Sequence, residues 1–255
     1  MSDRLRLERS GRTATLTVDH PPLNVLDLGM LAELGEAVET LAGQADLALV
    51  IVQAAGARAF SAGVSVQDHT ADKVADMLDL FHRALAGLAA LPAPSLAVVR
   101  GRCLGGGMEL ALACDWVLAA ETATFGQPEI ELGCFPPYAA ALYPGRIGRA
   151  RTLELLTLGR LLSGREAAEW GLATWSVPEA DLEGRRAEIV ARVEGLSAPV
   201  VRLAKRAVEA GDRRPFAEAL TECERLYLQE LAATQDMGEG LAAFLEKRRP
   251  TWRHR

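Results

Sequence analysis

The stretch that decides the fold is Gly101-Arg102-Cys103-Leu104-Gly105-Gly106-Gly107-Met108-Glu109-Leu110-Ala111-Leu112-Ala113-Cys114-Asp115. An apolar, strand-like run, 95–99, precedes it, and small and apolar residues continue it in a short helical pattern. Three consecutive glycines let the backbone turn sharply and let a ligand approach the N–H groups closely. The following helix directs its unpaired N–H groups and the positive end of its dipole at whatever lies over the glycines. This arrangement suits an anion, or an oxygen that becomes one, with the Glu109 carboxylate beside it.

The glycine triplet by itself has a second explanation, since a tight strand-to-helix turn accounts for it equally well. Two nucleotide-binding motifs are excluded. No Gly-Lys-Ser/Thr follows the triplet, which rules out a Walker-type phosphate loop, and Leu110 stands where a dinucleotide fingerprint needs Gly or Ala. The triplet therefore indicates an oxyanion site rather than a phosphate site.

Length and composition indicate an ordinary globular protein. The 255 residues are 49% hydrophobic and 24% charged, which suits one large domain or a domain with a helical extension. The formal charge of −6 gives no basic footprint for nucleic acid. The charged N-terminus lacks an apolar signal core, and no run approaches the length of a membrane span. Four cysteines without CxxC spacing predict reduced thiols and a cytoplasmic location.

Hydrophobic periodicity predicts alternating strands and helices over most of the chain. Residues 13–18 alternate with period 2, and residues 48–54 form the continuous apolar run that is typical of a buried parallel strand. Ser163 and Glu166 form a capping box, which predicts a short helix. The expected strands are 5–7, 13–18, 48–54, 95–99, 116–119, 124–125 and 172–177, and the expected helices are 28–41, capped by Asp27, and 72–91.

From residue 182 onward the pattern is almost wholly helical, with helices expected over 200–210, 216–233 and 238–247. Alternating strands and helices followed by a helical tail predict an α/β core with a separate helical part. We place the core at residues 1–197 and the tail at residues 198–255. A tail with apolar faces of its own commonly packs on a partner subunit.

A second carboxylate lies in Phe125-Gly126-Gln127-Pro128-Glu129-Ile130-Glu131-Leu132-Gly133. Here a predicted strand ends at a glycine and a proline, and Glu129 follows at once. Taken alone, an acidic residue after a proline is usually a solvated first-turn residue of a helix. Its combination with Glu109 and with a second glycine-bearing loop, 60–65, favours a functional role instead.

Together these features resemble the crotonase, or enoyl-CoA hydratase/isomerase, superfamily over nearly the whole chain. The two glutamates are 20 residues apart (129 − 109 = 20), which is the spacing found in the hydratases of that superfamily. Any one segment is weak evidence, but five in the same order are strong. The matching segments are Phe60-Ser61-Ala62-Gly63, Gly105-Gly106-Gly107-Met108-Glu109-Leu110-Ala111 with Asp115, Phe125-Gly126-Gln127-Pro128-Glu129, Glu239-Gly240, and Ala243-Phe244-Leu245-Glu246-Lys247-Arg248.

The resemblance implies a spiral of strand–strand–helix (ββα) units with a C-terminal helical trimerisation region. It implies an acyl-CoA thioester substrate, of which coenzyme A is a part, with no separate cofactor and no metal. The backbone N–H groups of Val64 and Gly106 would form the oxyanion hole, and Ala62 would contact the substrate. Phe244 matches a position that lines the acyl pocket. Lys247 matches one that reaches the CoA phosphate from a neighbouring subunit of a homotrimer or dimer of trimers, although outside this resemblance it would read as a solvated lysine.

The chemistry agrees with this resemblance. Adding water to an enoyl thioester builds enolate charge, and two fixed N–H donors stabilise that charge by about 2.7–4 kcal/mol each. The expected division of labour has Glu109 as the general base toward water and Glu129 as the donor of a proton to carbon. Two facing, buried carboxyl groups titrate as a unit with raised pKa values, whereas the helix dipole near Glu109 acts in the opposite direction.

Departures from the superfamily pattern concern the substrate. Ser65 replaces an aspartate that is usual in hydratases, and Cys134-Phe135-Pro136-Pro137-Tyr138 replaces a glycine-rich loop. Phe135 is therefore a candidate wall of the acyl pocket, the alternative being a rigid surface turn with Phe135 in the core. Asp68 and His69 follow the oxyanion loop, where a histidine is more often a structural hydrogen-bonding residue than a catalyst. Within the superfamily the segments are most similar to cyclohexa-1,5-diene-1-carbonyl-CoA hydratases, whose product is 6-hydroxycyclohex-1-ene-1-carbonyl-CoA.

Other functions compete with this one. A general enoyl-CoA hydratase, an isomerase or a decarboxylase would use the same scaffold, but many isomerases and decarboxylases of the superfamily lack one of the glutamates. A non-catalytic CoA-binding or assembly protein would need neither. A glycosidase would need an aromatic-rich sugar cleft, and aromatic residues make up 5% of the chain. The presence of both glutamates favours hydration.

Overall fold

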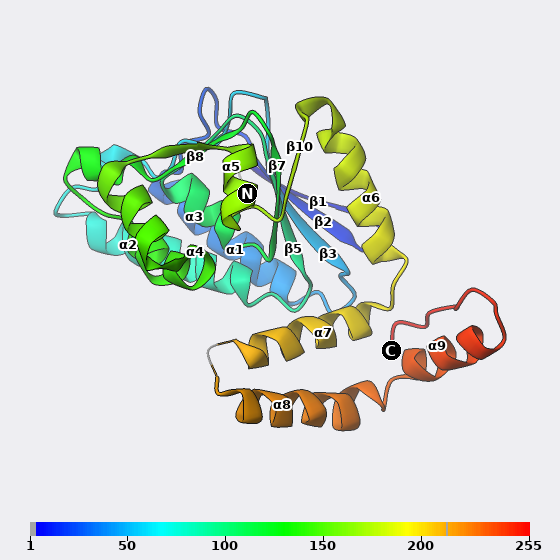
Figure 1. Ribbon diagram of the computed structural model, residues 1–255. Coiled ribbons are helices and arrows are strands. Elements are labelled where there is room, and N and C mark those ends of the chain that lie inside the picture. Colours follow the sequence, from blue (N-terminus) through cyan, green and yellow to red (C-terminus); the bar gives the residue numbers. More distant parts are fainter. Residues whose placement is uncertain (1–3, 213) are drawn as a thin grey trace.

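Two sheets form the centre of the computed structural model, which describes residues 4–212 and 214–255 (Figure 1). The larger sheet has the order β1-β2-β3-β5-β7-β10 and is parallel except between β1 and β2. The smaller sheet has the order β4-β6-β8-β9 and is parallel except between β8 and β9. The larger sheet contains β1 (Leu5–Ser10), β2 (Thr13–Val18), β3 (Leu49–Ala54), β5 (Ser95–Val99), β7 (Trp116–Ala120) and β10 (Trp175–Val177), and the smaller contains β4 (Ala59–Ser61), β6 (Arg102–Leu104), β8 (Thr124–Gly126) and β9 (Leu161–Ser163).

The two strands of each successive pair belong to different sheets. In each of the pairs β3–β4, β5–β6 and β7–β8, the first strand joins the larger sheet and the second joins the smaller one. A helix follows each pair, so the chain winds as a spiral of ββα units. Because β4, β6 and β8 are parallel neighbours, their carboxyl ends meet at one edge of the smaller sheet. The loops that carry the predicted site residues leave from these ends.

The core lies between the sheets and the helices that cover them. Strands β3 and β5 are almost entirely buried, as their continuous apolar sequences predict. Helix α1 begins where the sequence predicts, because the Asp27 side chain accepts a hydrogen bond from the Met30 N–H. The capping box at Ser163 and Glu166 is present as well. The helices of the core are α1 (Leu28–Ala42), α2 (Val74–Ala89), α3 (Gly106–Leu112), α4 (Pro137–Leu158), α5 (Gly164–Trp170) and α6 (Leu182–Glu194), with short 3₁₀ turns η1 (Val66–Asp68), η2 (Pro128–Leu132) and η3 (Glu179–Asp181).

The helical tail leaves the core after α6: its first helix, α7, runs below the core, and α8 lies on the side of α7 that is turned away from the core (Figure 1). The helix predicted over 216–233 is α-helical only as far as Arg225 and continues as one π-helical segment. Hydrophobic periodicity does not predict this change of helix type. The tail contains α7 (Ala198–Gly211), α8 (Phe216–Arg225), the π-helix η4 (Leu226–Leu231) and α9 (Gln235–Leu245).

Several elements depart from the sequence prediction. The last strand is confined to Trp175–Val177, shorter than the predicted 172–177. The sequence does not predict strands β4, β6 and β9, and the first two lie in segments interpreted as glycine-bearing loops. Helix α4 was not expected either. It starts at Pro137, contains Pro144, and is broken at Gly148, whose φ is 77°, so it lacks an uninterrupted apolar stripe.

Candidate active site

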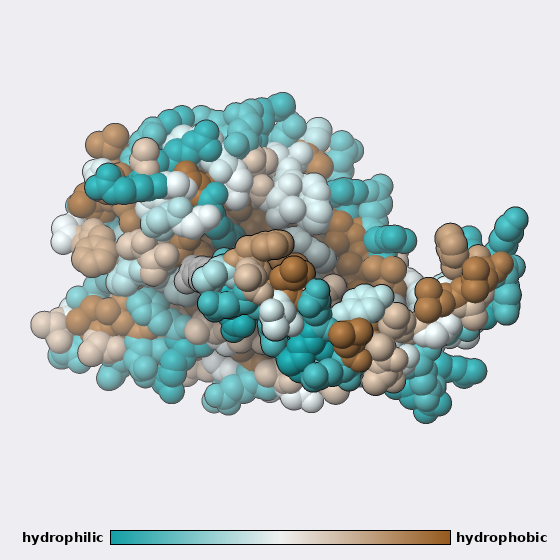
Figure 2. All heavy atoms as spheres, turned by 60° about the horizontal axis from the view of Figure 1, so that its bottom comes forward, coloured by the Kyte–Doolittle hydropathy of each residue, from teal (hydrophilic) through white to brown (hydrophobic). Residues whose placement is uncertain are grey.

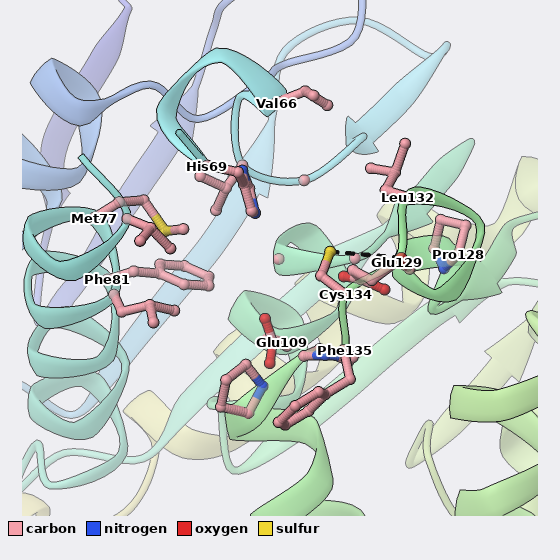
Figure 3. Close-up of a pocket in the computed structure, with 18 of the residues that line it drawn as sticks. Val66, His69, Met77, Phe81, Glu109, Pro128, Glu129, Leu132, Cys134 and Phe135 are labelled. Atoms are coloured by element: carbon pink, nitrogen blue, oxygen red, sulfur yellow. Dashed lines mark hydrogen bonds between the residues drawn. The ribbon is translucent and has the colours of Figure 1, made fainter. Parts of the chain in front are cut away.

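A cavity of about 430 Å³ opens where the loops after β4, β6 and β8 meet helix α2 (Figure 3). Both predicted glutamates, Glu109 and Glu129, line it, and their carboxyl groups project toward the same space. Its surface is otherwise mostly apolar. The remaining lining residues are Ala62, Gly63, Val64, Val66, His69, Val74, Met77, Leu78, Phe81, His82, Gly105, Gly106, Pro128, Leu132, Gly133, Cys134, Phe135, Pro136 and Pro137.

The glycine triplet is required because each glycine adjoins a different element. A Cβ on Gly105 would lie 2.6 Å from Glu129 Oε1, and the φ of Gly105 is +53°, a conformation that side chains disfavour. A Cβ on Gly106 would lie 2.8 Å from the Val64 side chain, and one on Gly107 would lie 2.5 Å from the Ser61 carbonyl oxygen. The triplet therefore brings the start of α3 against the oxyanion loop and against the second glutamate at once.

The two predicted oxyanion donors lie beside each other. Gly63, with a φ of +100°, is so close to the triplet that a Cβ on it would lie 3.2 Å from the Gly106 nitrogen. Within residues 4–212 and 214–255, no protein acceptor takes the N–H of Val64 or that of Gly106. The Gly106 N–H is unpaired because it opens α3, where no preceding helical carbonyl is available. Both amides are therefore free to bind an oxygen atom in the cavity.

Glu109 lies in the first turn of α3 and is buried, with only 4% of its surface exposed. Burial raises its pKa to about 7, and the neighbouring charge of Glu129 adds to the shift. The backbone N–H of Ala139 opposes it by donating to Oε1 of Glu109 at 2.9 Å. That N–H belongs to the first turn of α4, so the helix that the sequence did not predict holds this carboxylate with its N-terminal end.

Glu129 lies on η2, immediately after Pro128. Burial raises its pKa to about 7 as well. Two carboxyl groups with such pKa values, close enough for the charge of one to affect the other, share protons as a pair near neutral pH. One member can then accept a proton while the other donates one.

Two residues that sequence reasoning passed over support Glu129. Gln127 and Tyr143 are completely buried behind it and are hydrogen-bonded to each other. The signal available in the sequence was Gln127 itself, a polar residue between a strand end and the Pro128-Glu129 pair.

Asp68 and His69 receive separate explanations. Asp68 is buried, accepts a hydrogen bond from the Leu28 N–H at 3.2 Å and pairs with Lys73 at 3.4 Å, so it fastens η1 to the start of α1. His69 Nδ1 lies 2.9 Å from the carbonyl oxygen of Ser65, and its ring lines the cavity opposite Glu129 (Figure 3). This contact requires a proton on Nδ1, and it holds the ring at the cavity wall.

Of the four predicted substrate-binding residues, two line the cavity and two do not. Ala62 and Phe135 line the cavity, although 64% of Phe135 is exposed, which places it at the mouth and not in the core. Phe244 and Lys247, at the end of α9 and just beyond it, do not line the cavity of their own chain. Phe244 is 81% exposed.

Across the described residues, no group of three or more histidine, cysteine, aspartate or glutamate side chains is arranged to hold a metal ion. None of the helices described is both long and apolar enough to cross a membrane.

Comparison with known proteins identifies the class to which this fold and cavity belong. The enoyl-CoA hydratase/isomerase family model matches residues 8–255, so the chain belongs to that family. The crystal structure of an enoyl-CoA hydratase from Bacillus anthracis superimposes with a TM-score of 0.93 at 30% identity, covering 99% of this chain and all of that one. An enoyl-CoA hydratase structure from Geobacillus kaustophilus gives a TM-score of 0.95 at 26% identity, with 100% and 98% coverage. The fold is the crotonase spiral with its C-terminal helices.

Two individual relatives within this family are named as hydratases. A cyclohexa-1,5-dienecarbonyl-CoA hydratase of Thauera aromatica is 39% identical over 251 residues, which is 98% of this chain and 96% of the relative. A probable enoyl-CoA hydratase of Mycobacterium tuberculosis is 36% identical over 252 residues, 98% and 97% of the two chains. The protein is accordingly an enzyme of the enoyl-CoA hydratase type, a hydro-lyase.

Proposed function

We propose that this enzyme adds water to cyclohexa-1,5-diene-1-carbonyl-CoA and forms 6-hydroxycyclohex-1-ene-1-carbonyl-CoA. The observation that carries the hydration is the placement, in one cavity, of two glutamates with raised pKa values beside two unpaired N–H groups. The thioester oxygen accepts from Val64 and Gly106, which stabilises negative charge as it develops there. Glu109 takes a proton from water, the water oxygen bonds to carbon, and Glu129 gives its proton to another carbon of the substrate. The sum of these steps is the addition of one water molecule.

Two features support a cyclic acyl group. The first is the 39% identity to the Thauera aromatica hydratase over nearly the full length of both chains. The second is the segment from Cys134 to Pro137, all of which lines the cavity. Its two prolines restrict the backbone and lower the entropy cost of ordering it around a substrate. A flat ring would cover the Phe135 ring at the mouth better than a short linear chain would.

The second candidate is a general enoyl-CoA hydratase. The observation in its favour is the exposure of Phe135, which leaves the mouth of the cavity open and would admit linear chains of several lengths. The relative from Mycobacterium tuberculosis, at 36% identity, points in the same direction.

The remaining assignments complete the proposal. Coenzyme A enters as part of the substrate, and no other cofactor takes part. The tail, residues 198–255, joins copies of the chain into a homotrimer or a dimer of trimers in the cytoplasm, and Lys247 then reaches the CoA of a neighbour. Large apolar side chains on the outer surface of the tail support such contacts, and the face turned forward in Figure 2 carries several apolar areas. These side chains are Val208, Phe216, Leu220, Tyr227, Leu228, Leu241, Phe244 and Leu245.

Steady-state kinetics with two thioesters test the substrate assignment. We expect kcat/KM for the cyclic dienoyl-CoA to exceed that for crotonyl-CoA by at least about 100-fold, because apolar contacts and orientation of the reacting carbon act together. Equal values would leave the general hydratase. Turnover of neither thioester would contradict the proposed function altogether.

A further inference from the structure

Behind Glu129 a buried chain of polar groups leads to helix α4. Gln127 and Tyr143 have no exposed surface. The Gln127 amide satisfies both of its neighbours in one orientation: Oε1 accepts from the Tyr143 hydroxyl at 2.6 Å, and Nε2 donates to the two carboxyl oxygens of Glu129 at 3.0 and 3.1 Å. We call these three residues the Tyr143–Gln127–Glu129 chain.

The opposite orientation of the amide is unfavourable because its oxygen would then face the two Glu129 oxygens. Its nitrogen would donate to the Tyr143 hydroxyl oxygen, but the hydroxyl proton would lose Gln127 as its acceptor. A buried polar group without a partner is costly, so the Tyr143 proton selects the orientation. Burial also raises the pKa of Tyr143 well above its usual value, so the hydroxyl keeps this proton throughout the working pH range.

We propose that Tyr143 is a positioning residue of the active site: acting through Gln127, it keeps an N–H directed at Glu129 and so makes Glu129 a stronger proton donor to substrate carbon. The proposal rests on the hydration proposed above. An acid is stronger when the carboxylate that it leaves behind is hydrogen-bonded, and the Gln127 N–H supplies that bond. The N–H thus counteracts part of the burial that raises the pKa of Glu129.

The chain also gives α4 a function in the site that its sequence does not reveal. The Ala139 N–H in its first turn holds Glu109, and Tyr143, one turn further on, holds Glu129 through Gln127. One helix therefore orients both carboxyl groups. The other titratable groups near them are Cys134 beyond η2, Cys103 on β6, and His69 and His82 on the opposite wall.

Tyr143→Phe is the variant that tests the proposal, because it removes the hydroxyl and leaves the ring in place. Without the hydroxyl the amide is free to turn its oxygen toward Glu129, which favours the protonated carboxyl group. We expect kcat to fall about tenfold with KM changed less than about twofold, since one hydrogen bond is lost away from the substrate. We also expect the alkaline limb of the kcat profile, where Glu129 loses its proton, to move to higher pH.

Thr152→Val is the matched control. It removes another buried hydroxyl from α4, beyond the break at Gly148, one that donates to the Gly148 carbonyl oxygen at 2.9 Å and contacts neither glutamate. This variant should keep the kcat profile of the wild-type enzyme. An unchanged alkaline limb in Tyr143→Phe, or an equal shift in Thr152→Val, would overturn the proposal.

A double-variant cycle separates positioning from general support of the fold. If Tyr143 acts through Gln127, then Tyr143→Phe combined with Gln127→Leu is no slower than Gln127→Leu alone. Losses of kcat that multiply would show that Tyr143 acts independently of Gln127, against the proposal.

One measurement does not depend on turnover. Carbon-13 NMR of protein labelled at the glutamate carboxyl carbons, with Glu129→Gln to assign the signal, gives the pKa of Glu129 directly. A higher pKa in Tyr143→Phe than in the wild-type protein supports the proposal, and an equal or lower one contradicts it. If the wild-type protein hydrates no enoyl-CoA, the proposed function fails while this titration still decides the role of Tyr143.

Discussion

The core and the tail of this chain are stabilised in different ways. The core buries a continuous set of large apolar side chains between its sheets and helices, and the carboxyl groups of Glu109 and Glu129 line a cavity in it. Among the residues described in the tail, by contrast, the buried apolar side chains are Ala198, Ala219, Leu226 and Ala243. Most of the large apolar side chains of the tail face outward.

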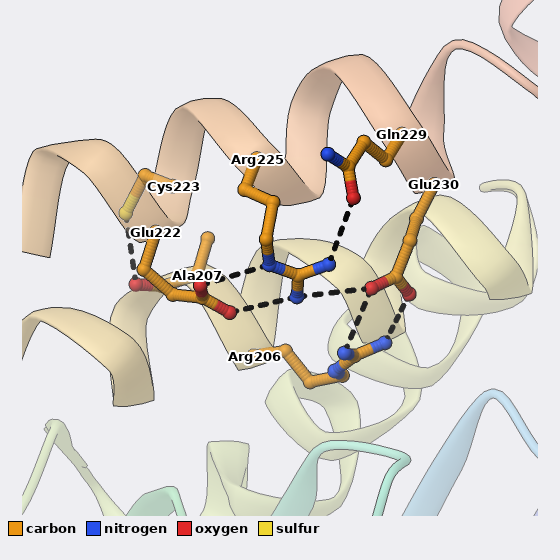
Figure 4. Close-up of polar contacts among 7 residues, drawn as sticks. All are labelled: Arg206, Ala207, Glu222, Cys223, Arg225, Gln229 and Glu230. Carbon is orange, nitrogen blue, oxygen red and sulfur yellow. Dashed lines mark hydrogen bonds and ion pairs between the residues drawn. The ribbon is translucent and has the colours of Figure 1, made fainter.

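Ion pairs link the helices of the tail to one another (Figure 4). Glu230 on η4 pairs with Arg206 on α7 and, at 3.2 Å, with Arg225 on α8. Arg225 also pairs with Glu222 at 2.7 Å. All four side chains are partly exposed to solvent, where such pairs contribute little to stability. The comparison indicates that the core is stable through burial, whereas the tail leaves much of its apolar surface exposed.

The largest expected effect is the loss of turnover when either glutamate of the core is neutralised. Glu109→Gln and Glu129→Gln should each lower kcat by at least about 100-fold, the lower range for general acid–base groups. The change is nearly isosteric, and circular dichroism would establish that the fold is retained. Near-wild-type hydration by either variant would contradict the two-glutamate mechanism.

The same Glu109→Gln change that lowers turnover should increase the stability of the folded protein at alkaline pH. Because burial raises the pKa of Glu109 from 4.5 to about 7, the folded state retains a proton that the unfolded state loses between those pH values. This contribution is fully present below pH 4.5 and is lost as the pH rises through 7. Glu109→Gln should therefore be more stable than wild type by about 1–3 kcal/mol at pH 8 and equally stable at pH 4.5.

Chemical denaturation at the two pH values measures this difference. Glu8→Gln, which changes an exposed carboxylate on β1, serves as the control and should show no such dependence. A Glu109→Gln variant that is less stable than wild type at pH 8 would mean that the carboxylate is well solvated or well paired in the folded state.

The predicted role of the tail can be measured in two quantities, the mass of the assembly and the KM for the acyl-CoA. We expect light scattering at micromolar concentration to give the mass of a trimer or hexamer, because the outward apolar side chains need covering. Lys247→Ala should raise KM for the acyl-CoA about fivefold with little change in kcat, as expected for one lost contact with a phosphate group. A monomeric protein, together with a Lys247→Ala variant that keeps the wild-type KM, would contradict a role of the tail in substrate binding.

The smallest effect is expected for the ion pairs of the tail. Arg225→Ala should lower the melting temperature by no more than about 2 °C, since exposed pairs are weak and screened by salt. A drop of ten degrees or more would mean that these pairs, and not a partner subunit, stabilise the tail.

The same contrast explains what could be predicted from the sequence. Long apolar strands such as β3 and β5, the Asp27 cap and the Ser163 capping box are local features, and all were predicted. The approach of Glu109 and Glu129 followed from the glycine triplet and from the family resemblance, and the cavity contains both.

The remainder depends on contacts between segments that no local pattern links. The Ala139 N–H binds a carboxylate 30 residues away, and Gln127 meets Tyr143 across 16 residues. Helix α4 supplies both contacts. Its prolines and the break at Gly148 interrupt the apolar periodicity from which a helix would be predicted. Phe244 and Lys247 do not line the cavity of their own chain, so their place in the site stays a prediction.

The central claim, that Glu109 and Glu129 add water to an unsaturated thioester in this cavity, is tested most directly with oxygen-18 water. The purified enzyme is incubated with cyclohexa-1,5-diene-1-carbonyl-CoA, and in parallel with crotonyl-CoA, and the thioester products are analysed by mass spectrometry. We predict one oxygen-18 atom per hydroxyacyl-CoA product, and no such product above the uncatalysed level from the double variant Glu109→Gln/Glu129→Gln. An isomerised or decarboxylated product without the label, or labelled product formed equally by the double variant, would contradict it.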